Sequence, residues 1–239
     1  MLLSEKQQIG DDFSCNFLNI LHNNGSSASK LDVAVSIMEE NFGHPYKIHR
    51  GRNIYFIPGI LFSQWSNSAY RSFDGFFTIT LEKGDEIITV ATIRIHENHM
   101  AEMPYIATRD DHKNQGMCRR LFHVIESALS YLNVEVLVIP SINELVNTWV
   151  KSFQFEPMDE ATQILIKERV VPFNINDVTM LQRKIPKHAL SSENLNFIEV
   201  FNNIKNQKVI EGKQVVHKIT AKNRRGGSSS RRRGRPRKG

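Results

Sequence analysis

The spacing of apolar residues changes along the chain, and the change predicts where helices give way to strands. Residues 30–42 (KLDVAVSIMEENF) place Leu, Val, Ile and Met side chains on one broad face, which predicts a helix. Residues 57–73 follow as a mostly helical or irregular stretch. Residues 76–108 (FFTITLEKGDEIITVATIRIHENHMAEMPYIAT) are rich in the Ile, Thr, Val and Phe that strands favour. Breaks at 82–86 and 96–100 therefore predict three antiparallel strands joined by two turns.

A helical period returns after residue 115. Residues 116–132 carry an apolar stripe made of Met117, Leu121, Val124, Ile125, Leu129 and Leu132. The uninterrupted apolar run 134–140 (VEVLVIP) predicts a strand buried on both faces. Residues 142–153 are amphipathic and predict a helix, and residues 178–185 predict a last strand. Strands first and then strand–helix–strand–helix predict an α+β fold, with a sheet that contains one parallel step.

The two ends of the chain look unlike its middle. Residues 1–30 end in a Gly/Ser/Asn-rich stretch and predict a leader or linker, in which FLNILHN forms at most a short helix without a partner. The folded domain is expected over 31–186. Residues 187–221 predict a polar linker that is part helical, and residues 222–239 (KNRRGGSSSRRRGRPRKG) cannot bury a core and are expected to be disordered.

Charge is concentrated in the last residues. Residues 213–239 hold eleven Lys and Arg and no acidic residue, so the rest of the chain carries 20 basic against 25 acidic side chains. An acidic body with a basic tail favours a nucleic-acid partner for the tail, or a nuclear-import signal. The N-terminus is too polar for a signal peptide and no apolar run has membrane-spanning length, so we expect a soluble intracellular protein without membrane contact.

Metal binding is not expected. The only cysteines, Cys15 and Cys118, are too few for a four-ligand zinc site, and no Cys/His pair has finger-like spacing. His96 and His99 stand in a strand–turn context in which a solvated loop histidine is the favoured interpretation.

The segment HKNQGMCRRLF, residues 112–122, predicts an anion site. A polar, basic approach meets Gly116, and the apolar stripe of the helix then begins. The first turn of a helix leaves its N–H groups without intrahelical partners, and the helix dipole makes that end positive. A glycine allows another group to come close to the backbone. The alternative is a helix entry at which the glycine merely relieves crowding.

These residues carry a family signature. A strand, a Q/R-x-x-G-x-G/A turn and a helix form the acetyl-CoA pyrophosphate site of the GNAT acetyltransferases, and here the turn reads Lys113, Asn114, Gln115, Gly116, Met117, Cys118. Residues 74–121, LNVEVLVIPSINELVNTWVKSFQFEPM and SIMEENF resemble the acetyltransferase domain of the plant Increased DNA Methylation family. In that family a PHD zinc finger precedes a histone-acetylating GNAT domain. The resemblance covers about residues 31–186, and the finger is not found in this chain.

The resemblance implies a GNAT fold and acetyl-CoA as co-substrate. The pyrophosphate would lie on the amides around Gln115–Cys118, with charge added by Lys113 and Arg119. The thioester would lie beside Tyr105, Ile106 and Ala107, whose backbone amides would polarise its carbonyl.

The resemblance also places Glu102 at the position of the catalytic glutamate of general-control-type histone acetyltransferases. As general base it would remove a proton from the acceptor amine, directly or through water. The alternative for Glu102 is a strand-end carboxylate in solvent or in a salt bridge. Glu97, on the preceding turn, is a weaker rival that we expect to be exposed.

Several positions depart from the family pattern. Lys113 replaces Gln or Arg, so it keeps a charge but loses the planar fork. Cys118 replaces a small Gly or Ala, and we expect a packed side chain rather than a nucleophile. Val150 stands at the position of the tyrosine that many GNAT enzymes use as general acid, and Gln154 replaces the following glycine. Trp149 has the helical spacing of a core residue.

The tail contains an AT-hook-like motif formed by Arg233, Gly234, Arg235, Pro236 and Arg237. The proline holds an extended backbone, and the arginines fit along a narrow A·T minor groove of negative potential. A nuclear-localisation signal or a generic polyanion-binding tail are alternatives that remain open. Taken together, the sequence predicts a nuclear acetyl-CoA-dependent protein N-acetyltransferase that acts on histone tails or other nuclear proteins and is held near A·T-rich DNA. A non-catalytic chromatin adaptor is the rival, and acetylation of a small amine is a third possibility.

Overall fold

The computed structural model describes residues 7–9, 12–18, 25–49, 52–62, 73, 75–96, 99–169 and 178–187. The chain divides into two units, Met1–Ile198 and Glu199–Gly239, and every described residue belongs to the first. The predicted linker after Lys187 and the AT-hook-like motif 233–237 lie outside the described residues. No helix in the described ranges is both long and apolar enough to cross a bilayer.

Among the described residues, eight strands form one mixed sheet in the order β1-β2-β5-β6-β7-β8-β10-β9. Every neighbouring pair is antiparallel except β7 and β8, which run parallel. The predicted α+β class with a single parallel step is confirmed. The strands are β1 (Gln7–Ile9), β2 (Phe13–Leu18), β5 (Phe76–Lys83), β6 (Glu86–His96), β7 (Met100–Thr108), β8 (Val136–Ser141), β9 (Glu156–Pro157) and β10 (Thr179–Lys184).

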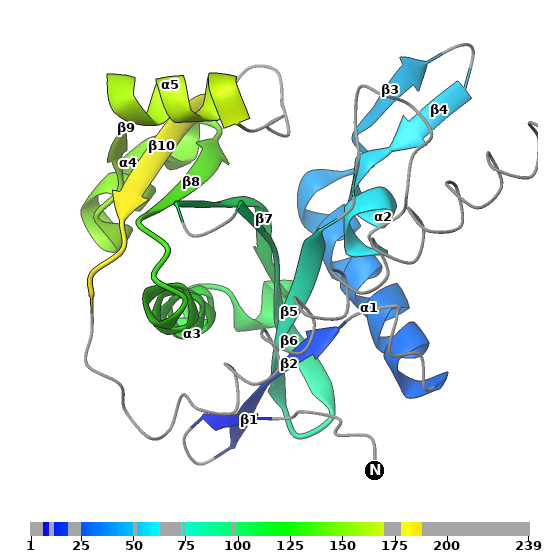
Figure 1. Ribbon diagram of the computed structural model, residues 1–239. Coiled ribbons are helices and arrows are strands. Elements are labelled where there is room, and N and C mark those ends of the chain that lie inside the picture. The colour runs from blue at the N-terminus through cyan, green and yellow to red at the C-terminus, as the bar shows by residue number, and fades with distance from the viewer. Residues whose placement is uncertain are drawn as a thin grey trace, which may run out of the picture. The chain divides into compact units, whose positions relative to one another are not determined.

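Helices cover both faces of this sheet (Figure 1). The helices α1 (Gly25–Phe42) and α2 (Phe56–Leu61) lie on one face, and α3 (Met117–Tyr131) lies on the other. The helix α4 (Asn143–Phe153) follows β8, and α5 (Glu160–Arg169) precedes β10. The core under α1 and α2 includes Leu31, Ile37, Met38, Ile57, Ile60, Val90, Tyr105 and Ala107. The helices predicted at 30–42, 116–132 and 142–153 are confirmed, although α1 begins earlier, at Gly25.

The prediction that residues 1–30 form a leader or linker is wrong for part of this range. Residues 7–9 and 13–18 form strands at the edge of the sheet. β2 pairs with β5 from Phe13↔Lys83 to Leu18↔Thr78, and Cys15 is completely buried there. The paired residues of β2 and β5 are 60 to 70 positions apart in the chain, and the six residues of β2 carry too little alternation to reveal the strand. The hairpin β3 (Tyr46–His49) and β4 (Arg52–Tyr55) and the helix α5 also went unpredicted.

Strands β7 and β8 part after only a few residues. They pair at Met100↔Val136, Ala101↔Leu137 and Glu102↔Val138, and β7 then stays with β6 while β8 stays with β10. The register of β6 and β7 shifts at the same place, where Met103 and Pro104 lie opposite Ile93. A bulge tolerates Pro104, which has no N–H for a ladder. In the second half of β7, the backbone N–H and C=O groups on the side of β8 therefore face a side on which β8 no longer pairs with them.

Candidate functional site

The turn before α3 leaves the start of that helix open. Gly116 is the N-cap residue with φ +80°, and no side chain caps the helix. The N–H of Arg120 donates to the carbonyl of Gly116 at 3.0 Å, which is the first bond of the helical ladder. The amides of residues 117–119 precede that bond, so they have no intrahelical acceptor. The sequence prediction of a helix that begins at Gly116 agrees with this geometry, and the left-handed conformation of the glycine is an addition from the structure.

Two side-chain contacts stabilise the turn before α3. Lys113 Nζ lies 2.5 Å from Asp110 Oδ1, and the Gln115 side-chain amide donates to the carbonyl of Asp111 at 2.7 Å. Lys113, Asn114, Gln115 and Gly116 are all exposed, and the next residue, Met117, is buried. Asn114, like Gly116, has a positive φ, of 61°. The turn is thus exposed and locally braced, with the charge of Lys113 partly offset by a neighbouring carboxylate.

Cys118 and Arg119, in the first turn of α3, have different surroundings. Burial raises the pKa of the Cys118 thiol to about 11 despite the opposing charge of Arg119. The thiol stays protonated at neutral pH, which agrees with a packed side chain and not with a nucleophile. The guanidinium of Arg119 lies 5.4 Å from the ring centroid of Phe153, the last residue of α4.

Tyr105, Ile106 and Ala107 lie on the part of β7 that has separated from β8. Tyr105 is 5% exposed and meets Phe42 of α1 edge to face, with ring centroids 5.0 Å apart. Ala107 is buried in the same core, so side-chain packing fixes this stretch of backbone. The end of β7 leads directly, through residues 109–116, to the open start of α3. The structure therefore brings the two predicted coenzyme-contacting segments to one end of β7.

Glu102 is the last β7 residue that pairs with β8, and it lies where the strands part. It is 5% exposed, and its Oε1 accepts hydrogen bonds from Arg94 Nε at 2.5 Å and meets His96 Nε2 at 2.8 Å. Burial raises the pKa of Glu102, but the His96 hydrogen bond and the Arg94 charge outweigh it and lower the pKa overall. The alternative to a general base was a carboxylate in solvent or in a salt bridge. The solvated form is wrong and the salt bridge is present, while the role as base stays a prediction.

Arg94 is itself held from the far side. Its guanidinium carbon lies 4.4 Å from the ring centroid of Phe76, on the neighbouring strand β5. Gly75 has φ +90°, and a Cβ built there would lie 3.3 Å from Arg94 Cδ. Stacking and close packing therefore direct the guanidinium toward Glu102.

The interpretation of His96 as a solvated loop residue is wrong. His96 is the last residue of β6, its side chain is 20% exposed, and it contacts Glu102. His99 fits that interpretation, since it is 45% exposed and lies 3.5 Å from Glu135. Glu97 lies outside the described residues. The alternation of IRIH, residues 93–96, was the available signal, because it puts Arg94 and His96 on one face of a strand next to Glu102.

The segment at the end of α4 supplies packing. Trp149, as predicted, is a core residue, 9% exposed, with its ring centroid 4.7 Å from that of Phe153 and 5.4 Å from that of Phe155. Val150 is 38% exposed. Gln154 adopts φ +58° as the C-cap of α4, the left-handed conformation for which the family pattern uses glycine.

A cavity of about 600 Å³ lies at the opposite end of α3 from the open helix start. It surrounds the C-terminal end of α3 and the first residues of β8, and its lining includes His99, Ser130, Glu135, Asp159, Lys184 and Lys187. α3 has 15 residues, so its two ends are about 22 Å apart. The cavity is therefore separate from the open start of α3. The described residues contain no group of three or more His, Cys, Asp or Glu side chains placed to hold a metal ion.

Comparison with known proteins agrees with this arrangement. The model of the Increased DNA methylation 1 C-terminal domain matches residues 45–184. Increased DNA methylation 1 of Arabidopsis thaliana is 45% identical over 139 residues, which are 58% of this chain and 12% of that protein. The chain thus spans about an eighth of the length of this relative.

Solved structures show the same fold at low sequence identity. Tetrahymena GCN5 superposes with a TM-score of 0.58 at 14% identity over 73% of this chain and 98% of that one. The catalytic domain of the Tetrahymena GCN5 histone acetyltransferase in complex with coenzyme A superposes with a TM-score of 0.51 at 13% identity, over 77% and 99% of the two chains. The predicted GNAT fold, a mixed and mostly antiparallel sheet flanked by helices, is confirmed.

Proposed function

This chain belongs to the family of the Increased DNA methylation 1 C-terminal domain, and from that premise we propose that it is a nuclear, acetyl-CoA-dependent N-acetyltransferase of histone lysines. One observation carries the proposal. The gap between β7 and β8 begins at buried Glu102 and leads along β7 to the uncapped start of α3. An elongated thioester with an anionic end fits such a path, because its reactive and charged ends need different surroundings.

The open start of α3 would receive the pyrophosphate of the coenzyme. The amides of residues 115–118 supply donors, and Lys113 and Arg119 add positive charge. An anion at a helix start gains about 0.3–1 kcal/mol from the dipole, and hydrogen bonds from the aligned amides add to this. The backbone of Tyr105–Ala107 would pair with the amide groups of the coenzyme arm and polarise the thioester carbonyl.

The acceptor would be a lysine amine. Removing its proton at pH 7 costs about 4–5 kcal/mol, since the pKa of a free lysine is near 10.4. Glu102 supplies the negative charge that draws this proton away. The neutral amine then attacks the carbonyl carbon, the C–N bond forms, and the C–S bond breaks to release coenzyme A as a thiol. The support that the Tetrahymena histone acetyltransferase gives for a histone lysine as substrate is limited to the similarity of its fold.

The tail would hold the enzyme near chromatin. Arg233, Arg235 and Arg237 around Pro236 match an A·T minor-groove hook, and a tether raises the effective concentration of nearby histones. A single hook binds weakly, and its affinity falls steeply with salt.

Calorimetry with acetyl-CoA and label transfer from radiolabelled acetyl-CoA to core histones test the proposal. Gly116→Ala should weaken acetyl-CoA binding about tenfold, because its Cβ meets no protein atom within 4 Å and so would project toward the ligand. Gly84→Ala is the matched control, with φ +60° and open space in the β5–β6 turn. A folded protein that binds acetyl-CoA without transferring label would be a non-catalytic adaptor, and one without saturable binding would refute the coenzyme site.

A further inference from the structure

Building on the proposed acetyl transfer, we propose that His96 is the group that receives the proton of the acceptor amine, and that Glu102 orients its imidazole ring. The family resemblance assigns proton removal to Glu102 alone. The contacts around Glu102 give its carboxylate a different task and bring a second titratable group into reach.

Register places the three polar groups together. Arg94 pairs with Glu102 and His96 pairs with Met100 across β6 and β7, so Arg94 and His96 share one face of β6. Both reach the same atom, Glu102 Oε1, at 2.5 Å and 2.8 Å. The side chain of His96 is 20% exposed and that of Glu102 is 7% exposed. A substrate that arrives from solvent therefore meets the imidazole before the carboxylate.

The carboxylate is poorly suited to accept the proton itself. Its Oε1 already has two partners, and the overall effect of its surroundings is to favour the ionised form. A carboxylate that is stabilised as an anion is a weak proton acceptor near neutral pH, where a general base works best when its own pKa lies close by. Imidazole is the side chain that exchanges protons most readily in this range.

The hydrogen bond also selects the tautomer. An ionised carboxylate only accepts, so Nε2 of a neutral His96 must carry the hydrogen that points at Glu102. Nδ1 then has the lone pair. Among the described residues, no hydrogen bond or ion pair to His96 Nδ1 is found. This arrangement, with a carboxylate behind one ring nitrogen and a basic second nitrogen in front, is the one by which enzymes make histidine a general base.

Nδ1 of His96 takes one proton from the ammonium of the acceptor, and the resulting imidazolium is stabilised by Glu102. The neutral amine attacks the thioester carbonyl and the C–N bond forms. When the C–S bond breaks, the second proton of the nitrogen passes to the departing sulfur, and His96 later returns its proton to solvent. Arg94 and Glu102 are the charged groups found around His96, and Arg94 keeps the carboxylate ionised and in place.

Steady-state kinetics with acetyl-CoA and core histones, run from pH 6 to pH 9, test this role in the full chain. His96→Gln keeps a donor for Glu102 but has no basic nitrogen, and we expect kcat to fall about 100-fold with little change in the KM for acetyl-CoA. His99→Gln, three residues away and half exposed, is the matched control and should behave as wild type. Added imidazole should restore part of the activity of His96→Ala, which a purely structural role would not permit.

The outcomes separate this role from the function on which it rests. Wild-type transfer together with an equally active His96→Gln of unchanged pH profile overturns the role of His96 alone. A wild type that binds acetyl-CoA but transfers no label overturns the proposed function and this role with it. If His96→Gln does not fold, ¹⁵N spectra of the wild type decide, since a hydrogen on Nε2 supports the proposal and one on Nδ1 overturns it.

Discussion

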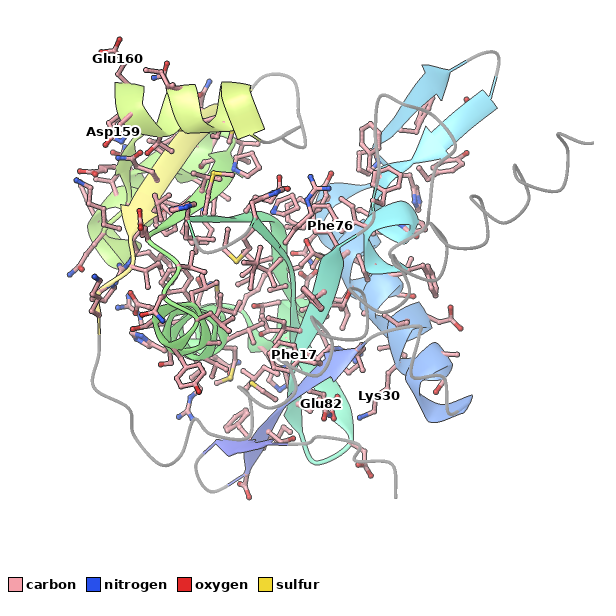
Figure 2. The ribbon with its side chains drawn as sticks, viewed as in Figure 1. Phe17, Lys30, Phe76, Glu82, Asp159 and Glu160 are labelled. Atoms are coloured by element: carbon pink, nitrogen blue, oxygen red, sulfur yellow. The ribbon has the colours of Figure 1, made fainter. Side chains whose placement is uncertain are left out.

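Two buried glutamates on the same sheet show how partners and position give one residue type different tasks. Glu82 of β5 has no exposed surface, and Lys30 of α1 holds both of its carboxylate oxygens at 2.9 and 2.7 Å (Figure 2). Thr80 donates to the same carboxylate. Glu102 of β7 is nearly as buried, but its partners, Arg94 and His96, come from the adjacent strand.

The difference lies in what each ion pair joins. Lys30–Glu82 connects a helix to the sheet at a residue of β5 that has a partner on both sides, Ser14 of β2 and Ile87 of β6, although the β5–β6 register shifts beside it. Glu102 lies at the point where β7 and β8 separate, and its two partners come from β6 of the same sheet. Burial in an ion pair therefore does not by itself identify a functional carboxylate, and what sets Glu102 apart is its place where two neighbouring strands stop pairing.

The strongest test of this contrast is the turnover of two matched variants. Glu102→Gln should lower kcat at least 100-fold, because it removes the charge that assists proton transfer. Glu82→Gln should leave kcat per folded molecule within about twofold, because it lies in paired sheet away from the opening. The measurement is label transfer to histones at saturating acetyl-CoA. Equal losses for the two variants would remove the functional distinction.

Stability should show the reverse order. Glu82→Gln leaves the ammonium of Lys30 without its carboxylate, and since the Lys30 side chain is 30% exposed, we expect a loss of about 2–3 kcal/mol in the free energy of unfolding. Chemical denaturation followed by circular dichroism measures this. Glu102→Gln serves as the comparison, and a larger loss there than for Glu82→Gln would contradict the structural role of Lys30–Glu82.

The two ends of β5 offer a finer comparison. At Gly75, with φ +90°, alanine would press on Arg94 Cδ, and a displacement of a few tenths of an ångström should lower kcat about 3–10-fold. At Gly84, with φ +60° and no atom within 4 Å of a Cβ, alanine should lower the free energy of unfolding by about 1–2 kcal/mol through backbone strain, as it should at Gly75. Unlike at Gly75, kcat should not change. Equal kinetics for the two variants would show that Arg94 does not position Glu102.

The smallest expected effect is on the free energy of unfolding at acid pH. The folded-state pKa of Glu102 is lowered, so its ion pair contributes stability that is fully present above the ordinary pKa of 4.5 and is lost as the pH falls below it. The wild type should therefore lose more stability between pH 5.5 and pH 3.5 than Glu102→Gln does. Unfolding titrations in urea at these pH values measure the difference. An identical acid dependence would mean that Glu102 gains nothing from its partners.

The sequence predicted the segments whose pattern is local. About ten residues are enough to identify the type of element in three cases: the strands of 76–108, the apolar stripe of α3 and the buried run of β8. β1 and β2 were not predicted because their pairing depends on β5, which lies far along the chain. The hairpin β3–β4 was not predicted because each of its strands has only four residues. Short elements have too few positions for a period to appear.

The candidate site divides in the same way. Gly116 and Glu102 were predicted from motif and resemblance, and the structure places Glu102 on β7 and Gly116 at the start of α3, the next helix along the chain. The partners Arg94 and His96 were not predicted, because their contact with Glu102 depends on the register of β6 against β7 and on the shift opposite Ile93. No pattern within a single segment determines such a register.

The early separation of β7 and β8 has a mechanical meaning. Among the described residues, three pairs join the strands β1, β2, β5, β6 and β7 to the strands β8, β10 and β9, so the sheet has a seam at its centre. An extended ligand laid along the free side of β7 would act as a splint across that seam, as an added strand would. Occupancy of this side of β7 and stiffness of the whole sheet would then rise together.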